Sequence, residues 1–294
     1  MSGVLDDIFF GASTIRSYTY SLWLDRYGYN SGHLLLGGID KIAFIPPLKT
    51  LDTTVSNQSF GLWSGPVLTV NTMIGSVRLG DNATELNISL GRTVLSTSPF
   101  IWLPPTTAVA IWDVLGVDYR PYVNGVPVPS ISQESDLQDR DPIVPCSYLT
   151  NNTIIDFQFV GSDIPVFVSL SDLVFQSPYP TPDENDVLQR LCQLKIRALA
   201  EGDLTTFGTP ILQQLYQVHD HDNKVISIAL TDYPSQDKDI VPIPQKGGVA
   251  VMDLPTTANV TQPPSGANGG KESFSASSSF GLLVIFVLAA LFVF

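Results

Sequence analysis

The alternation of apolar and polar residues predicts a chain built mainly from β-strands. Residues 17–24, which read Ser-Tyr-Thr-Tyr-Ser-Leu-Trp-Leu, alternate in strand fashion, and a polar turn separates them from a second strand at 32–36. Turns rich in Gly, Asn and Pro separate the later strand-like segments. The fold class that follows is all-β, that is, mainly β with short helices. The later predicted strands span residues 66–70, 74–79, 85–90, 153–160 and 164–169.

One stretch stands at the centre of this pattern. Residues 92–105 read Arg-Thr-Val-Leu-Ser-Thr-Ser-Pro-Phe-Ile-Trp-Leu-Pro-Pro, which predicts an apolar strand, a turn of small residues and a second apolar strand. Residues 106–115 then carry apolar side chains at helical spacing, with Thr106 or Thr107 as the N-cap and Gly116 as the stop. We therefore expect a short amphipathic helix directly after the central stretch.

The periodic pattern ends near residue 235. Residues 236–279 are dominated by Pro, Ser, Thr, Gly and Asn, which predicts a flexible stalk. Residues 280–294 are uncharged and almost wholly apolar, yet a helix of this length falls short of the roughly 30 Å hydrocarbon core of a membrane. We expect a folded domain at 1–235, a stalk at 236–279 and a hydrophobic anchor-signal tail at 280–294.

Composition and charge narrow the function classes. A chain of 294 residues that is 44% hydrophobic can bury a core of ordinary size. Fifteen Lys and Arg against 28 Asp and Glu give a net charge of -13, which repels phosphate backbones and excludes nucleic acid as a partner. An acidic, sparsely charged surface suits a secreted protein.

Two cysteines and five glycosylation sequons point to the secretory pathway. Cys146 and Cys192 predict a disulfide, with two free thiols as the alternative. The first ten residues contain no basic segment, long apolar run or small-residue cleavage site, so we expect a truncated chain, an alternative start or an incomplete gene model of a longer precursor. The sequons are at Asn57, Asn82, Asn87, Asn151 and Asn259.

The sequence predicts neither a metal site nor a cofactor. The two cysteines and the three histidines, His33, His219 and His221, lack the usual spacing of metal ligands. We interpret the histidines as exposed residues at strand edges.

Four segments, in this order, resemble pepsin-like aspartic peptidases. They are the hairpin ending in Gly37-Gly38-Ile39-Asp40, the loop before Leu103-Pro104, the Cys146/Cys192 pair and a closing element. The resemblance covers approximately residues 15–232 and implies an aspartic peptidase-like β-barrel lobe, the carboxyl-terminal one, with the amino-terminal lobe missing. It also implies that the cysteine pair is the disulfide of that lobe. The resemblance implies that Gly208 allows a close backbone approach beside the catalytic loop, which a side chain would block. The residues at the offsets of the closing element are Phe207, Gly208, Leu212, Tyr216, Asp220 and Ala229.

In that family each lobe supplies one Asp-Thr/Ser-Gly, and the two carboxylates share a proton and polarise a water. Aligned on Leu103-Pro104, this chain has Leu95, Ser96, Thr97 and Ser98 in place of Asp, Thr or Ser, Gly, and Thr or Ser. Leucine holds neither a proton nor a water, and a β-branched Thr97 replaces the glycine that lets two loops approach. The resemblance therefore predicts no catalytic residue at this degenerate loop.

Three other carboxylates offer no substitute. Asp52-Thr53-Thr54 lacks the glycine, the apolar lead-in and the following Leu-Pro, and is interpreted as a surface turn. Asp113 falls within the predicted helix, and Asp220 matches a structural aspartate of the family.

Two functions remain open at this point. The first is a catalytically inactive cell-surface relative of aspartic peptidases, whose half-cleft binds a peptide or protein ligand or has a structural role. The second is an active aspartic-type endopeptidase working at acidic pH, represented here by a truncated chain. A single lobe also exposes apolar surface, so we expect residues 1–235 alone to be poorly soluble.

The carboxyl terminus predicts attachment to a membrane. Small residues at 265–270, a polar spacer at 271–279 and the apolar tail match the signal for a glycosylphosphatidylinositol (GPI) anchor, with Asn268 as the attachment residue. The resemblance implies a fungal-type GPI-anchored family member at the plasma membrane or cell wall. The alternative is a short transmembrane tail.

Overall fold

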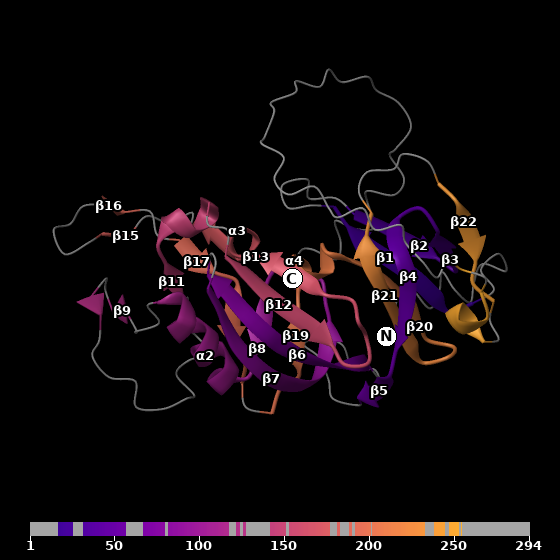
Figure 1. Cartoon of the computed structure of the whole chain (residues 1–294), viewed down its shortest axis with the longest axis horizontal. Helices are drawn as coiled ribbons and strands as arrows, with labels where there is room; N and C mark the ends of the chain where they lie inside the picture. The colour runs from indigo at the N-terminus through magenta and orange to yellow at the C-terminus, as the bar shows by residue number, and fades with distance from the viewer. Residues whose placement is uncertain are drawn as a thin grey trace, which may run out of the picture. The chain divides into compact units, whose positions relative to one another are not determined.

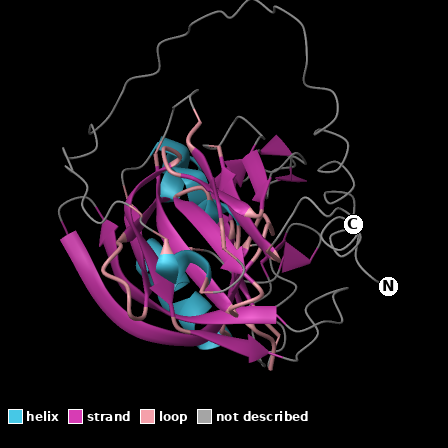
Figure 2. Ribbon diagram, turned by 90° about the vertical axis from the view of Figure 1, so that its right-hand side faces the viewer, coloured by secondary structure: helices cyan, strands magenta, loops and turns pink. Residues whose placement is uncertain are grey.

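Strands make up most of the described structure and the helices are short, as Figure 2 shows. This computed structural model confirms the predicted mainly β fold class. The structure describes residues 17–25, 32–56, 67–79, 82–117, 122–123, 126–127, 142–150, 153–176, 181–182, 188–189, 192–200, 202–232, 238–244, 247–252 and 254.

The larger sheet has eight strands in the order β13-β12-β6-β7-β19-β8-β18, with β5 paired to β6. Neighbours are antiparallel except β19 with β7 and β18 with β8, which run parallel. Parallel neighbours require a crossover, so segments far apart in the sequence meet here. The strands are β5 (Thr53–Ser56), β6 (Val67–Leu79), β7 (Asn82–Leu95), β8 (Ile101–Leu103), β12 (Ile154–Phe159), β13 (Val166–Ser169), β18 (Ile196–Ala198) and β19 (Thr205–Phe207).

The longest element is the antiparallel hairpin of β6 and β7. The prediction of separate strands at 66–70 and 74–79 was wrong, because β6 continues through both. Two register shifts in its pairing with β7, between Thr72 and Met73 and between Ile74 and Ser76, accommodate the residues that looked like turns. Bulges absorb such residues without ending a strand.

The predicted helix after the central stretch is α2 (Pro105–Leu115). Its buried residues include Ala108, Ile111 and Trp112, and it contacts β18 and β8. Figure 1 shows α2 beside β8. Gly116 ends the helix in the left-handed conformation with φ of 62°, as predicted. The predicted threonine N-cap was wrong, because the N-cap residue is Pro104. The helix begins with Pro105, which has no backbone N–H that would need a hydrogen-bond acceptor.

The second sheet has five strands in the order β2-β1-β20-β21-β4, so it combines early strands of the chain with the late strands β20 and β21. Figure 1 shows its indigo N-terminal strands beside the orange C-terminal strands. The predicted pair at 17–24 and 32–36 forms the antiparallel strands β1 and β2. The strands are β1 (Thr19–Leu24), β2 (Gly32–Leu36), β4 (Phe44–Leu51), β20 (Leu215–Asp220) and β21 (Val225–Thr231).

A third sheet of three strands has the order β11-β17-β14. Its strands are β11 (Ile143–Val144), β14 (Val174–Gln176) and β17 (Cys192–Leu194). Three short helices connect strands along the sequence: η2 (Cys146–Thr150), α3 (Leu170–Leu173) and α4 (Thr209–Leu212). Two small hairpins complete these elements: β9 (Tyr122–Val123) with β10 (Val126–Pro127), and β15 (Thr181–Pro182) with β16 (Leu188–Gln189).

Residues after β21 contribute to a second, smaller hydrophobic cluster. Strand β22 (Ile240–Pro242) pairs with β3 (Gly38–Asp40), and the 3₁₀ helix η3 (Gly248–Val251) follows. The side chains of Ile243 and Val249 are buried in a cluster with those of β20. These residues fall within 236–279, the segment predicted as a flexible stalk. Their apolar side chains are too few to form a periodic pattern along the sequence, so the sequence did not predict this strand and helix.

Candidate functional site

The central stretch lies where two distant segments cross. Strand β7 ends at Leu95, which pairs in parallel register with Phe207 of β19. The Ser96 N–H donates to the Phe207 carbonyl oxygen at 3.0 Å, and the Thr209 N–H donates to that of Ser98 at 2.7 Å. The loop after β7 is thereby held on both sides of the Phe207-Gly208 step.

Gly208 confirms the prediction of close backbone approach. A Cβ atom built there would overlap the carbonyl oxygens of Ser98 and Phe100. Both are backbone atoms, so no side-chain rotation could relieve the overlap. A glycine is therefore required where β19 meets the loop.

The loop hydroxyls bond to the loop itself. The Ser96 Oγ accepts the Ser98 N–H at 3.2 Å. The Ser98 Oγ accepts the Phe100 N–H at 3.2 Å and the Trp102 Nε1–H at 3.3 Å. These bonds give the tip a defined shape with short polar side chains, as in an Asx or Ser/Thr turn.

The remaining loop side chains carry no ionisable group. Leu95 is half-buried and packs against the main core, the larger buried cluster, which includes Phe157, Phe159 and Phe207. Thr97 is exposed. Phe207, directly beside Leu95, lies edge-to-face with Phe157 and Phe159 at centroid distances of 5.3 and 5.9 Å. The surroundings of Leu95 thus suit an aliphatic side chain.

Three carboxylates singled out in the sequence lie on other elements. Asp52 is exposed between β4 and β5, and Asp113 is exposed on α2. Asp220, at the end of β20, is fully buried and accepts bonds from the backbone N–H and side-chain amide of Asn223. Asp220 shapes the β20–β21 turn, in agreement with the structural role expected for it.

The hairpin motif and the closing element contact each other in the structure. Tyr216 is fully buried, and its hydroxyl oxygen accepts the N–H of Asp40 at 2.9 Å. Burial raises the pKa of Tyr216 to about 12. Its ring packs against Phe44 and Trp23 with centroids 5.0 and 5.1 Å away.

Two basic residues of β17–β18 near the loop were missed by the sequence analysis. The Arg197 guanidinium carbon lies 4.5 Å from the centre of the Phe100 ring, and Arg197 is 8% exposed. Lys195 donates from Nζ to the Asp172 carbonyl oxygen at 2.8 Å, and burial lowers its pKa to about 8. The alternation Lys195-Ile196-Arg197 in an apolar segment was the available signal.

The histidines differ from the prediction of exposed edge residues. His219 is 7% exposed and stacks on Tyr20 with centroids 4.7 Å apart, so that prediction was wrong for it. His221 is half-buried beside Tyr18, and His33, which is exposed, stacks on Trp23. Within the described part of the chain no three His, Cys, Asp or Glu residues are grouped as metal ligands.

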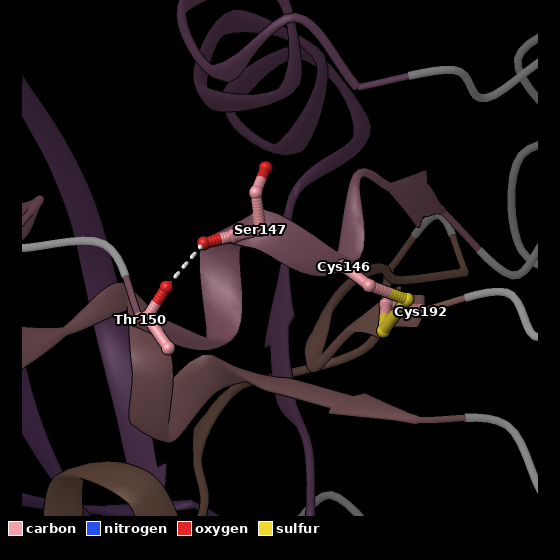
Figure 3. The surroundings of a disulfide bond; sticks show 4 residues. All are labelled: Cys146, Ser147, Thr150 and Cys192. Carbon is pink, nitrogen blue, oxygen red and sulfur yellow. Dashed lines mark hydrogen bonds between the residues drawn. A yellow bond between two sulfur atoms is a disulfide. The ribbon is translucent and has the colours of Figure 1, made fainter.

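The disulfide predicted from the cysteine pair is present. Figure 3 shows Cys146, at the start of η2, joined to Cys192 of β17, with a Cα–Cα distance of 5.1 Å. The Thr150 hydroxyl donates to the Ser147 carbonyl oxygen at 3.1 Å within the same 3₁₀ turn (Figure 3). The bridge ties η2 to the three-stranded sheet.

Of the predicted modification sites, Asn82 and Asn87 lie on β7 and are exposed. Asn57, Asn151, Asn259 and the anchor residue Asn268 lie outside the described residues, as does the tail at 280–294. None of the helices in the described ranges has the length and apolar character needed to span a membrane.

Comparison with known proteins identifies relatives of most of the chain. The chain is 29% identical over 265 residues to "Probable aspartic-type endopeptidase OPSB" of Arthroderma benhamiae, covering 85% of this chain and 48% of that protein. It is 28% identical over 257 residues to "Probable aspartic-type endopeptidase opsB" of Aspergillus fumigatus, covering 85% and 46%. "Secreted aspartic protease 4" of Candida albicans is 28% identical over 229 residues, covering 76% and 44%.

The chain spans about half the length of these curated relatives. A family model described as "Eukaryotic aspartyl protease" matches residues 4–231, which is most of the chain. The match includes the loop at the end of β7 and the closing element that crosses it. The chain therefore belongs to the eukaryotic aspartyl protease family.

Proposed function

We propose that this chain is a catalytically inactive, cell-surface member of the aspartyl protease family. The observation that carries the proposal is Leu95 at the end of β7, packed against the core where the resemblance places a catalytic aspartate. The neighbouring Ser96 and Ser98 hydroxyl oxygens accept bonds from within the loop. The loop keeps its structural contacts without a group that could exchange a proton.

Peptide hydrolysis in this family depends on a pair of carboxylates. One deprotonated Asp acts as the general base on water, while its protonated partner hydrogen-bonds the substrate carbonyl. An aliphatic side chain performs neither role. The three carboxylates considered as substitutes, Asp52, Asp113 and Asp220, lie on other elements. Asp220 also accepts hydrogen bonds from Asn223.

The alternative is an active aspartic-type endopeptidase of which this chain is a part. It is favoured by the names of the relatives, several of which are called endopeptidases. The upstream coding sequence discriminates between the two functions in part, since a signal peptide and an Asp-Thr-Gly triplet there would supply the first half of a two-lobed enzyme. Leu95 would still leave the second carboxylate missing.

Activity can be tested directly on the full chain. We expect no cleavage of an unfolded protein substrate or a peptide library between pH 3 and 6, with pepsin as the positive control. Cleavage that pepstatin blocks would contradict the proposal and favour the endopeptidase. Cleavage that pepstatin leaves unchanged would be assigned to a contaminating enzyme and checked with a second preparation.

We also propose a route to the cell surface. The Cys146–Cys192 disulfide and the similarity to Secreted aspartic protease 4 support passage through the secretory pathway. Small residues around Asn268 and the apolar tail support a GPI anchor, with a short transmembrane tail as the alternative. Release of the protein from intact cells by phosphatidylinositol-specific phospholipase C would support the anchor, and retention would favour the transmembrane tail.

The half-cleft is proposed to hold a peptide or protein ligand. Aromatic side chains Phe100 and Trp102 flank the loop, with ring centroids 5.9 Å apart, and both are half-buried. Such rings contribute contact area at low entropic cost. Changes in tryptophan fluorescence on titration with a peptide library provide the measurement, and no change for any peptide would favour a structural role.

A further inference from the structure

The β6–β7 hairpin leaves one side of a long strand open. Strand β7 pairs with β6 from Asn82 to Thr93, but on its other side it pairs with β19 only at Thr93–Leu95. In the part of the chain that the structure describes, residues 82–90 have no strand on that side (Figure 1). These nine residues form an open edge of the larger sheet.

This open edge is suited to unwanted pairing. Leu86, Ile88 and Leu90 pack towards the main core, while Asn87 and Ser89 on alternate positions are exposed. An edge strand that presents unpaired N–H and C=O groups is a template for a strand of another molecule. Natural proteins protect such edges with bulges, charges or covering groups.

Both described sequons lie on this edge. The first is Asn82-Ala83-Thr84 at the end of the hairpin, and the second is Asn87-Ile88-Ser89. The two asparagines and the two hydroxyl residues are all exposed. Exposure of the asparagine and of its Ser or Thr leaves room for a bulky, solvated glycan on the folded chain.

The backbone at Asn87 is also distinctive. Asn87 has a φ of 47°, and it falls at the register shift where two residues of β7 oppose Gly75 of β6. Asparagine tolerates this left-handed conformation better than most residues. The bulge therefore interrupts the regular ladder at the same point where the second sequon stands.

We propose that Asn82 and Asn87 are N-glycosylated and that their glycans shield the open edge of β7. The donor is an oligosaccharide linked to a lipid pyrophosphate. The asparagine Nδ2 bonds to the anomeric carbon of the sugar and gives up one proton to the surrounding water. The bond from that carbon to the pyrophosphate oxygen breaks, its electron pair stays on the oxygen, and the lipid pyrophosphate leaves. The inference rests on the proposed passage through the secretory pathway.

Modification is tested on the full chain produced in yeast with a yeast secretion leader fused to its amino terminus. The leader directs the chain into the secretory pathway. Peptide mass spectrometry of protein from the medium and from the secretory compartments is expected to show sugar on Asn82 and Asn87. Unmodified asparagine at both positions would overturn the proposal. Because the leader provides entry, this result would leave the proposed cell-surface function intact.

Matched variants separate the sugar from the side chain that carries it. Thr84→Ala and Ser89→Ala remove the two sequons and keep both asparagines, including the left-handed backbone at Asn87. Ser89→Thr keeps the second sequon and serves as the control. Each alanine variant is expected to lose the mass of one glycan that endoglycosidase can remove. The Ser89→Thr variant is expected to keep both glycans.

Shielding is tested by the association of folded protein. We expect the double variant Thr84→Ala/Ser89→Ala, and the parent protein trimmed by endoglycosidase in its folded state, to associate at concentrations where the untreated protein does not, as measured by light scattering. Equal association of all three would overturn the shielding role. Trimming leaves the amino-acid sequence unchanged, so it remains informative even if the double variant folds poorly.

Discussion

The buried histidine His219 should make this fold lose stability in acid. His219 lies on β20, stacked on Tyr20 and within 3.3 Å of the Gln217 side-chain oxygen. Burial is the main cause that lowers its pKa to about 3, and the neighbouring His221 contributes. A group that is neutral when folded and takes up a proton when unfolded favours the unfolded state as the pH falls.

The sign and size follow from this shift. The pKa of His219 is 6.5 in the unfolded chain and lower in the folded protein. Well above pH 6.5 the histidine is neutral in both states and does not change the unfolding free energy. As the pH falls from 6.5 towards 3, the unfolded chain alone takes up the proton, and the unfolding free energy decreases. Each pH unit in this window costs about 1.4 kcal/mol, so moving from pH 7 to pH 4.5 removes about 2.5 kcal/mol of unfolding free energy. The full loss below pH 3 is about 5 kcal/mol.

The assay is urea unfolding at pH 7 and pH 4.5, followed by circular dichroism. Other groups also titrate, so the informative quantity is the difference between the wild-type protein and a variant. His219→Phe retains a ring against Tyr20 and should reduce the loss between the two pH values by about 2.5 kcal/mol. His219→Gln, which keeps a polar side chain, should do the same. His33→Gln is the control, because the His33 side chain is 49% exposed.

An unchanged pH dependence in both His219 variants would refute this reasoning. It would mean that His219 becomes charged in the folded protein without penalty, despite its 7% exposure. An equal reduction in His33→Gln would also refute it, because the effect would then not depend on burial.

Three further predictions concern the fold around the loop. Gly208→Ala should cost at least about 3 kcal/mol in urea unfolding because of backbone overlap, whereas Gly116→Ala, with open space but a φ of 62°, should cost about 1 kcal/mol; similar losses would contradict the overlap. Cys146→Ser removes a bridge with a sequence separation of 46 and should cost about 4 kcal/mol, with no loss ruling out a stabilising bridge. Leu95→Asp should lower stability by about 2 kcal/mol and produce no peptidase activity, since one carboxylate is insufficient; pepstatin-sensitive cleavage would contradict this.

Much of the local structure could be predicted from the sequence. The pattern at 17–24 and 32–36 predicted β1 and β2, and the run after the central stretch predicted α2 with its stop at Gly116. These features depend on neighbouring residues, whose period and turn chemistry are visible along the chain. The resemblance added Gly208 and the cysteine pair, both of which have the expected contacts.

The candidate site was only partly predictable. Leu95 and the loop hydroxyls were identified from sequence, but the use of Ser96 and Ser98 as acceptors within the loop required the fold. The basic residue Arg197 was missed because its contact with Phe100 joins positions nearly a hundred residues apart. Sequence spacing carries no direct information about such pairs.

The sequence by itself determined the strand-rich class, the position of the short helix and the absence of a carboxylate at residue 95. Only the tertiary structure decided that His219 is buried, that β22 returns to pair with β3, and that residues 82–90 of β7 remain an open edge. The physical reason is common to all three. Local periodicity shows which residues can form a strand, but burial and pairing depend on which other strands lie against it.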